Sequence, residues 1–165
     1  MRIIGVDPGT RHLGWGIVRA EGTRLTHESH GIVHTNTALS LAERLVQIDA
    51  ALQAVIDEHA PEEAAVESIF YAKDAQAASK LGHARGVVLL VMAKAGLAIY
   101  EYPPARVKRA VSGRGRADKT QVAMMVRALL GMREMPGSDA TDALAVAITH
   151  AQFSRVDRVL RAAQR

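Results

Sequence analysis

Four acidic residues each lie directly beside an apolar stretch of the chain instead of within a solvated run of charges; they are Asp7, Glu67, Asp139 and Asp142. Moving an ionised carboxylate out of water is costly unless a partner charge compensates for it. Hard oxygen ligands that are held together favour Mg²⁺ or Mn²⁺ over Zn²⁺. The residue types and their placement therefore predict a metal-dependent enzyme.

Asp139 and Asp142 lie three residues apart, so a helix that begins near Ser138 would place both carboxylates on one face. Such a pair at a helix start can also be a capping arrangement that complements the helix dipole. Asp142 precedes the apolar run ALAVAI, which places at least one acid on the core-facing part of the helix. Together with two carboxylates from strand ends, this set can hold two Mg²⁺ ions about 3.5 to 4 Å apart for phosphodiester hydrolysis by water.

The segment GVDPGT ends an apolar strand at Asp7 and then turns. Taken alone, Asp-Pro-Gly is more often turn chemistry than catalysis. The apolar strand before it favours a catalytic role for Asp7. We expect Gly5, Gly14 and Gly16 to leave room for the backbone of a substrate.

Basic residues are concentrated between residues 106 and 119 of a chain whose net charge is +4. They are Arg106, Lys108, Arg109, Arg114, Arg116 and Lys119, against the single acid Asp118. This run predicts a loop between helices that contacts phosphates, with Arg114 and Arg116 as DNA-binding candidates. Lys119, at a helix start, could neutralise charge that develops on the scissile phosphate, although a solvated surface lysine is the more frequent case.

The segment ESIFYAKD places the adjacent aromatic residues Phe70 and Tyr71 just past Glu67, in a chain with only 4% aromatic residues. Phe70 has two interpretations of equal weight. It packs in the core as a helix-entry residue, or it stacks on a base beside the cut phosphate.

Hydrophobic periodicity and turn signals predict one α/β domain. The expected strands span residues 2–7, 13–18, 24–35, 63–67 and 97–101, and the expected helices span 39–59, 73–95, 105–111, 118–130 and 139–154. The first three strands are expected to be antiparallel. The nuclease domain is predicted to span residues 1–154, followed by a basic, flexible C-terminal tail at 155–165.

The chain contains no cysteine, which excludes disulfide scaffolds, thiolate zinc sites and cysteine nucleophiles. It opens with the strand-like run MRIIGV, which lacks the features of a secretory signal, and no stretch is apolar enough to span a bilayer. We therefore expect a cytoplasmic protein without a membrane partner.

Between Arg2 and about Phe153, the chain resembles the bacterial RuvC Holliday junction resolvases. The matching segments are GVDPGTRHLGWGIV, AVESIFYAKDAQAASKLGHARGV, ARVKRAV, DKTQVAMMVRALL and SDATDALAVAITH. The resemblance implies a ribonuclease-H-like α/β fold, with a mixed central sheet of about five strands flanked by helices. It also implies a homodimer, Mg²⁺-dependent symmetric nicking of four-way DNA junctions, and cooperation with the RuvA and RuvB branch-migration proteins.

By position, the resemblance places a role on each of seven residues. Asp7, Glu67, Asp139 and Asp142 fall on the catalytic tetrad, Phe70 on the junction-contacting aromatic position, and Lys108 and Lys119 on basic DNA-binding positions. Some relatives carry histidine where this chain has Asp139.

The helix expected at 73–95 could form an apolar stripe between two copies of the chain through Leu81, Val88 and Val91, or pack these residues within one copy.

Two other functions remain as alternatives. An ATP-handling enzyme of the actin and sugar-kinase class would need a second, similar domain, and GVDPGT is not repeated. A non-catalytic junction-binding module would use the acids only for caps and turns.

Overall fold

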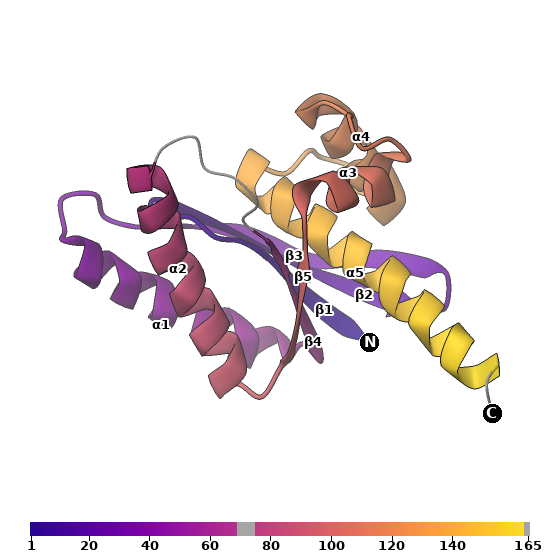
Figure 1. Ribbon diagram of the computed structural model, residues 1–165, viewed down its shortest axis with the longest axis horizontal. Coiled ribbons are helices and arrows are strands. Elements are labelled where there is room, and N and C mark those ends of the chain that lie inside the picture. The colour runs from indigo at the N-terminus through magenta and orange to yellow at the C-terminus, as the bar shows by residue number, and fades with distance from the viewer. Residues whose placement is uncertain (69–74, 164–165) are drawn as a thin grey trace.

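The computed structural model of the protein describes residues 1–68 and 75–163, and it contains a five-stranded mixed sheet with helices on both faces (Figure 1). The strand order is β3-β2-β1-β4-β5. The first three strands are antiparallel, whereas β4 pairs parallel to both β1 and β5. The strands are β1 (Arg2–Asp7), β2 (His12–Glu21), β3 (Arg24–His34), β4 (Glu63–Glu67) and β5 (Ala98–Tyr102). The predicted mixed sheet is confirmed.

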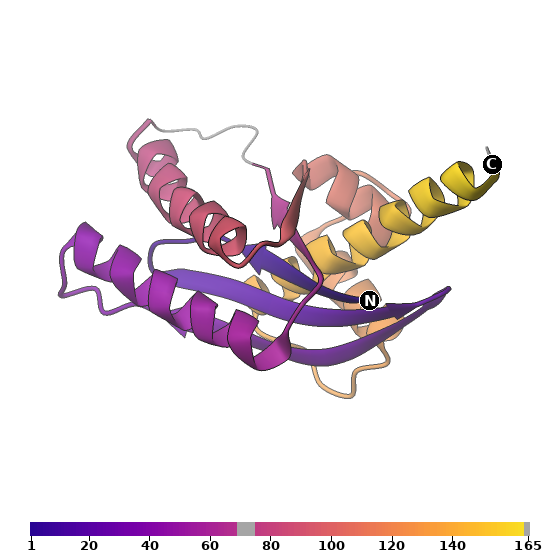
Figure 2. The same cartoon turned by 90° about the horizontal axis from the view of Figure 1, so that it is seen from below.

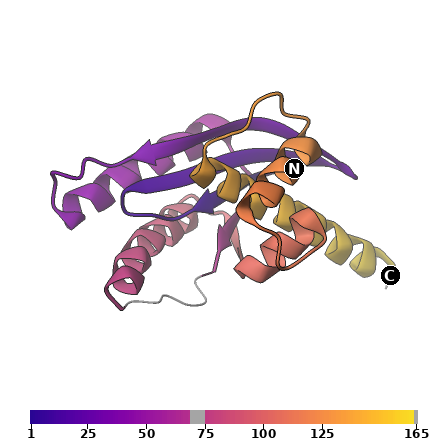
Figure 3. The same cartoon turned by 90° about the horizontal axis from the view of Figure 1, so that it is seen from above.

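The helices form two groups. On one face of the sheet lie α1 (Leu41–His59) and α2 (Ala75–Lys94), and on the other lies α5 (Ser138–Ala163) (Figure 2). The short helices α3 (Pro104–Ser112) and α4 (Lys119–Leu130) contact α5 on that second face (Figure 3). None of the helices in the described ranges is long and apolar enough to cross a membrane.

One helix boundary differs clearly from the prediction. The last helix was expected to end at Ser154, but α5 continues to Ala163. Part of the segment expected to be a flexible tail is therefore helical. The residues after Ser154 include four arginines and two alanines, residue types of high helix propensity, which favour continuation of the helix.

Alternation along the strands divides the core into two layers. Ile4 and Val6 face α1 and α2, whereas Ile3 and Ala65 face α5. The first layer also contains Val88 and Val91 of α2, both fully buried. Of the two alternatives for this helix, packing within one copy therefore holds for these two valines.

Glycines in the sheet allow α5 to approach it closely. A Cβ atom on Gly5 would lie 2.0 Å from the carbonyl oxygen of Ala143, and one on Gly14 would lie 1.9 Å from that of Asp139. The space that these glycines provide is filled by the backbone of α5. The expectation that they make room for a substrate is therefore wrong, because they instead bring the acidic start of α5 against β1 and β2.

The buried side chain of His150 joins α5 to β4 and β5. The imidazole of His150 is fully buried, with Nε2 2.6 Å from Oε2 of Glu63 and Nδ1 2.8 Å from the hydroxyl oxygen of Tyr102. A carboxylate only accepts hydrogen bonds, so Nε2 carries the hydrogen that is donated to Glu63. These contacts fix α5 relative to β4 and β5.

Replacing His150 with leucine is expected to lower the free energy of unfolding by about 2 to 5 kcal/mol, because it removes both hydrogen bonds while keeping an apolar side chain in the core. Urea denaturation followed by circular dichroism measures this loss. The matched control is Thr149→Val, since the hydroxyl of Thr149 is equally buried but donates only to the carbonyl of Ala145 in its own helix. Equal losses in the two variants would contradict this role for His150.

Candidate active site

Two carboxylates lie at the ends of neighbouring parallel strands. Asp7 is the last residue of β1 and Glu67 the last residue of β4. Asp7 continues the alternation that turns Ile3 toward α5, and Glu67 continues that of Ala65. Both side chains therefore extend from the same edge of the sheet toward that helix. Asp139 and Asp142 lie in the first turns of α5, and the backbone of Asp139 packs against Gly14 of β2. The structure therefore brings the four predicted carboxylates to one region.

The electrostatics of these side chains show that they interact. The pKa of Asp7 is raised to about 7, first by burial and then by the negative charges of Asp142, Glu67 and Asp139. Burial also raises the pKa of Glu67, and Asp142 adds to this effect. Lys119 acts in the opposite direction on both groups. The four carboxylates therefore concentrate negative charge at one edge of the sheet.

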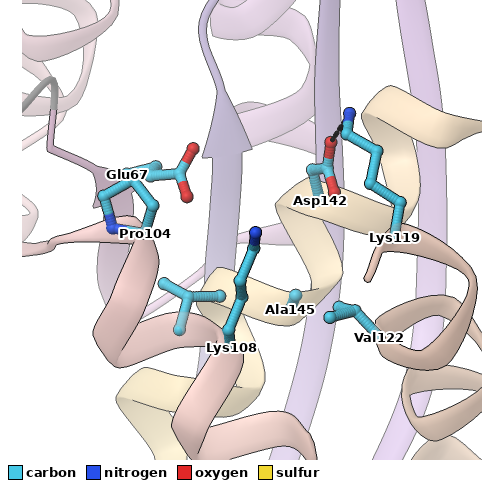
Figure 4. A pocket seen from close by; sticks show the side chains of 8 residues that line it. Glu67, Pro104, Lys108, Lys119, Val122, Asp142 and Ala145 are labelled. Atoms are coloured by element: carbon cyan, nitrogen blue, oxygen red, sulfur yellow. Dashed lines mark hydrogen bonds and ion pairs between the residues drawn. The ribbon is translucent and has the colours of Figure 1, made fainter. Parts of the chain in front are cut away.

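A cavity of about 220 Å³ opens beside these acids (Figure 4). Its polar wall contains Glu67 and Asp142, together with the side chains of Lys108 and Lys119. Nζ of Lys119 lies 3.4 Å from Oδ2 of Asp142, and the proximity of Asp142 is the main cause of the raised pKa of Lys119. The charge of Lys108 opposes the rise in the pKa of Glu67. Two cations thus face the acidic edge from α3 and α4.

The local sequence explains how the two lysines are positioned. Lys119 is the first residue of α4, where Asp118 caps the helix by accepting a hydrogen bond of 2.8 Å from the backbone of Gln121. Helix α3 begins with Pro104, a residue favoured at that position. The cavity floor includes Val107 and Val122, which sequence reasoning did not single out. Their helical spacing from Val111 and Val126 was the available signal, and both are buried in the core around α5.

The donor set can be compared with what a metal ion requires. Within residues 1–68 and 75–163, no group of three or more acidic, histidine or cysteine side chains is arranged to hold a metal ion as the structure stands. The chemistry nevertheless fits a hard divalent cation, because carboxylate oxygens are the preferred ligands and a cation would relieve the repulsion that raises the pKa of Asp7. Such an ion would have to draw the carboxylates together.

The sequence profile described as crossover junction endodeoxyribonuclease RuvC matches residues 3–150. The chain belongs to the RuvC family. A crossover junction endodeoxyribonuclease RuvC from Sorangium cellulosum is 57% identical over 150 residues, which cover 91% of this chain and 84% of that protein.

Solved structures agree with this assignment. A structure of T. thermophilus RuvC in complex with Holliday junction substrate has a TM-score of 0.90 at 38% identity, and the match covers 95% of this chain and 96% of that one. The yeast mitochondrial Holliday junction resolvase Ydc2 has a TM-score of 0.66 at 9% identity, with 94% and 82% of the two chains covered, which shows the fold alone. The predicted ribonuclease-H-like α/β fold is confirmed.

The other residues that the sequence predicts to contact DNA are less closely grouped. Arg114 and Arg116 are exposed on the segment that connects α3 to α4. Arg106, from the same basic run, lies over the ring of Phe153 at 3.8 Å and so contacts the protein itself. Phe70 lies outside the described residues, so both interpretations of it remain predictions.

Proposed function

We propose that this chain is a structure-selective endonuclease that cuts four-way DNA junctions by metal-dependent hydrolysis, through symmetric nicks in two strands. The observation that carries the proposal is the gathering of Asp7, Glu67, Asp139 and Asp142 beside two lysines at one edge of the sheet. Membership of the RuvC family supports the reaction, and the T. thermophilus relative, solved in complex with a Holliday junction, supports the substrate.

The proposed cofactor is Mg²⁺, with two ions per site and with Mn²⁺ as a substitute. Asp7, Glu67, Asp139 and Asp142 would hold them, because they are the carboxylates that interact electrostatically at this edge. When bound, the ions supply activation of water and stabilisation of the leaving oxygen of the phosphodiester. Asp7 and Glu67 must be ionised to act as ligands, so their raised pKa values oppose ion binding at low pH.

The basic side chains have the task of holding the DNA backbone. Lys119 is mostly exposed and approaches the acids from the start of α4, where it can neutralise charge on the scissile phosphate. Lys108 lines the same cavity from α3. Arg114 and Arg116 extend this positive surface beyond the cavity, where they would contact phosphates without reading the base sequence. Phe70 is proposed to stack on a base at the crossover.

We also propose that two copies of the chain associate through the outer face of α2. Gly82, Gly86, Leu90 and Ala93 are exposed there at helical spacing, and Leu90 retains 56% of its accessible surface. A Cβ atom on either glycine would meet none of the described residues within 4 Å. A glycine inside a helix costs about 1 kcal/mol relative to alanine, so two glycines that no contact among the described residues explains favour close approach by a second helix. A two-fold dimer would place its two active sites on two DNA strands of like polarity in the junction.

Substituting Gly86 with arginine is expected to convert the dimer to a monomer that remains folded, because the new side chain enters open space in the single chain and obstructs the second copy. Sedimentation velocity gives the oligomeric state, and thermal unfolding confirms the fold. The matched control is Ala128→Arg, on the exposed side of α4. A dimer that persists in the Gly86 variant would rule out this face.

The proposed cellular setting follows from the RuvC family alone. We propose that the protein acts in the cytoplasm and receives junctions from the RuvA and RuvB branch-migration proteins. The nuclease proposal does not depend on either partner.

Incubation of the protein with a labelled four-way junction and with a matching duplex, each with Mg²⁺ or with chelator, tests the proposal. Cleavage of the junction alone, and only with metal, is the expected result. Binding of the junction without any cleavage, in both Mg²⁺ and Mn²⁺, would favour a structural junction binder.

A further inference from the structure

The loop that follows Asp7 is anchored by side chains that are not among the four acids and two lysines of the site. Residues 8–11 connect β1 to β2, and the carbonyl oxygen of Thr10 in this loop accepts three hydrogen bonds. Arg44 donates two of them, from Nε at 3.1 Å and from Nη2 at 2.7 Å. The hydroxyl of Thr35 donates the third at 2.7 Å. A single main-chain oxygen is thus bound by two side chains that are distant in sequence.

The two donors are themselves firmly placed. Arg44 lies in the first turns of α1, whose start is fixed by the reciprocal hydrogen bonds of Ser40 and Glu43. Thr35 directly follows β3 and is only 7% exposed, and its backbone N–H donates to the carbonyl of Arg11 at 3.1 Å. The loop is therefore tied to α1 on one side and to the end of β3 on the other.

The contacts of Arg44 are unusual for a cation. Among the described residues, both side-chain hydrogen bonds of Arg44 go to this one carbonyl oxygen, and no carboxylate forms an ion pair with its guanidinium. Its planar fork presents two donors to the same acceptor, which a lysine cannot do. A half-buried guanidinium is thus committed to fixing a short stretch of backbone.

That stretch adjoins a carboxylate under repulsion. Asp7 forms the last pair of β1, with Gly14 of β2, and every residue between them belongs to the loop or to the start of β2. The negative charges of Asp142, Glu67 and Asp139 all act on Asp7. The loop itself is tight, since a Cβ atom on Gly9 would lie 2.1 Å from the carbonyl oxygen of His12.

We propose that Arg44 and Thr35 are positioning residues, which hold the 8–11 loop and thereby keep Asp7 within reach of Asp142 and Glu67 for cation binding. This inference rests on the proposed function. It assigns to α1 and β3, which supply none of the four acids, a part in assembling the site.

Mn²⁺ binding to the DNA-free protein, followed by electron paramagnetic resonance, measures this role directly. In Arg44→Ala and Thr35→Val, the dissociation constant is expected to rise by about 10- to 100-fold, which is the usual effect of removing a group that supports a metal ligand. Arg44→Lys should behave nearly as Arg44→Ala because it lacks the fork, whereas Thr35→Ser keeps the hydroxyl and should behave as the wild type. At a fixed Mg²⁺ concentration, kcat should fall with the loss of affinity while KM for the junction stays within about twofold.

The matched control is Arg2→Lys, at the opposite end of β1, where the guanidinium binds Glu28 at 2.8 Å. This variant is expected to lose stability without a change in Mn²⁺ affinity. If Arg44→Ala and Thr35→Val lower the melting temperature but bind Mn²⁺ as the wild type does, the two residues are only structural and the inference is overturned. A wild-type protein that binds Mn²⁺ but cuts no junction would contradict the proposed function, while the affinity comparison would still decide the positioning role. A wild type without Mn²⁺ affinity would overturn both.

Discussion

Replacing Asp7 with asparagine is expected to reduce junction cleavage by more than about 100-fold, the upper range for groups that only support a metal ligand. The asparagine side chain would keep the shape of the aspartate but would lack the negative charge that a divalent cation requires. Junction binding should remain, because the basic residues of α3, α4 and their connection are unchanged. Single-turnover cleavage and gel-shift assays on the same junction separate these two effects.

The control for this substitution is Asp57→Asn, on the exposed side of α1. Among the described residues, only Gln53 donates a hydrogen bond to this carboxylate. It should cleave as the wild type does. Retention of wild-type cleavage by the Asp7 variant would remove Asp7 from the mechanism, and with it the proposed ligand set.

The metal-free protein is expected to lose stability as the pH rises from about 4 to about 7. Asp7 has a folded pKa of about 7, above the ordinary value of 3.8, so between these values the folded state binds a proton that the unfolded state has released. Stability therefore falls with rising pH across this window, by on the order of a few kcal/mol for a shift of this size. The raised pKa of Glu67 acts in the same direction.

Urea denaturation in chelator at several pH values measures this dependence. The Asp7→Asn variant is the reference, because it lacks the titrating group but keeps every other carboxyl group. Subtracting its profile isolates the contribution of Asp7 from that of groups such as Glu28, whose lowered pKa has the opposite effect on stability at lower pH. With saturating Mg²⁺, the Asp7 contribution should reverse in sign, since the ionised form binds the cation. A wild-type protein that gains stability relative to the variant between pH 4 and 7 in chelator would contradict the account.

The carboxylates could be identified from the sequence because each lies beside an apolar stretch, at a strand end or in the first turns of a helix. The strand ends at Asp7 and Glu67 and the start of α5 are local features, and the structure places them at one edge. Spacing also predicted the helix that begins beside Asp118. These elements follow from periodicity and capping, which depend only on nearby residues.

Features that depend on three-dimensional contacts were missed or misread. Gly5 and Gly14 look like space for a substrate until the position of α5 is known. Val88 and Val91 have the same spacing whether they face a partner or their own core, and the structure resolves this in favour of the core. The anchor on Thr10 joins segments that are 25 and 34 residues away along the chain, and no local pattern marks such a contact.

The most direct test of the central claim is to map every nick that this protein makes on the four end-labelled strands of a mobile DNA junction, with Mg²⁺ and with chelator. The account predicts a symmetric pair of nicks on two strands of like polarity, only with metal, and none on the matching duplex. Nicks that persist in chelator, or that occur equally on the duplex, would contradict it.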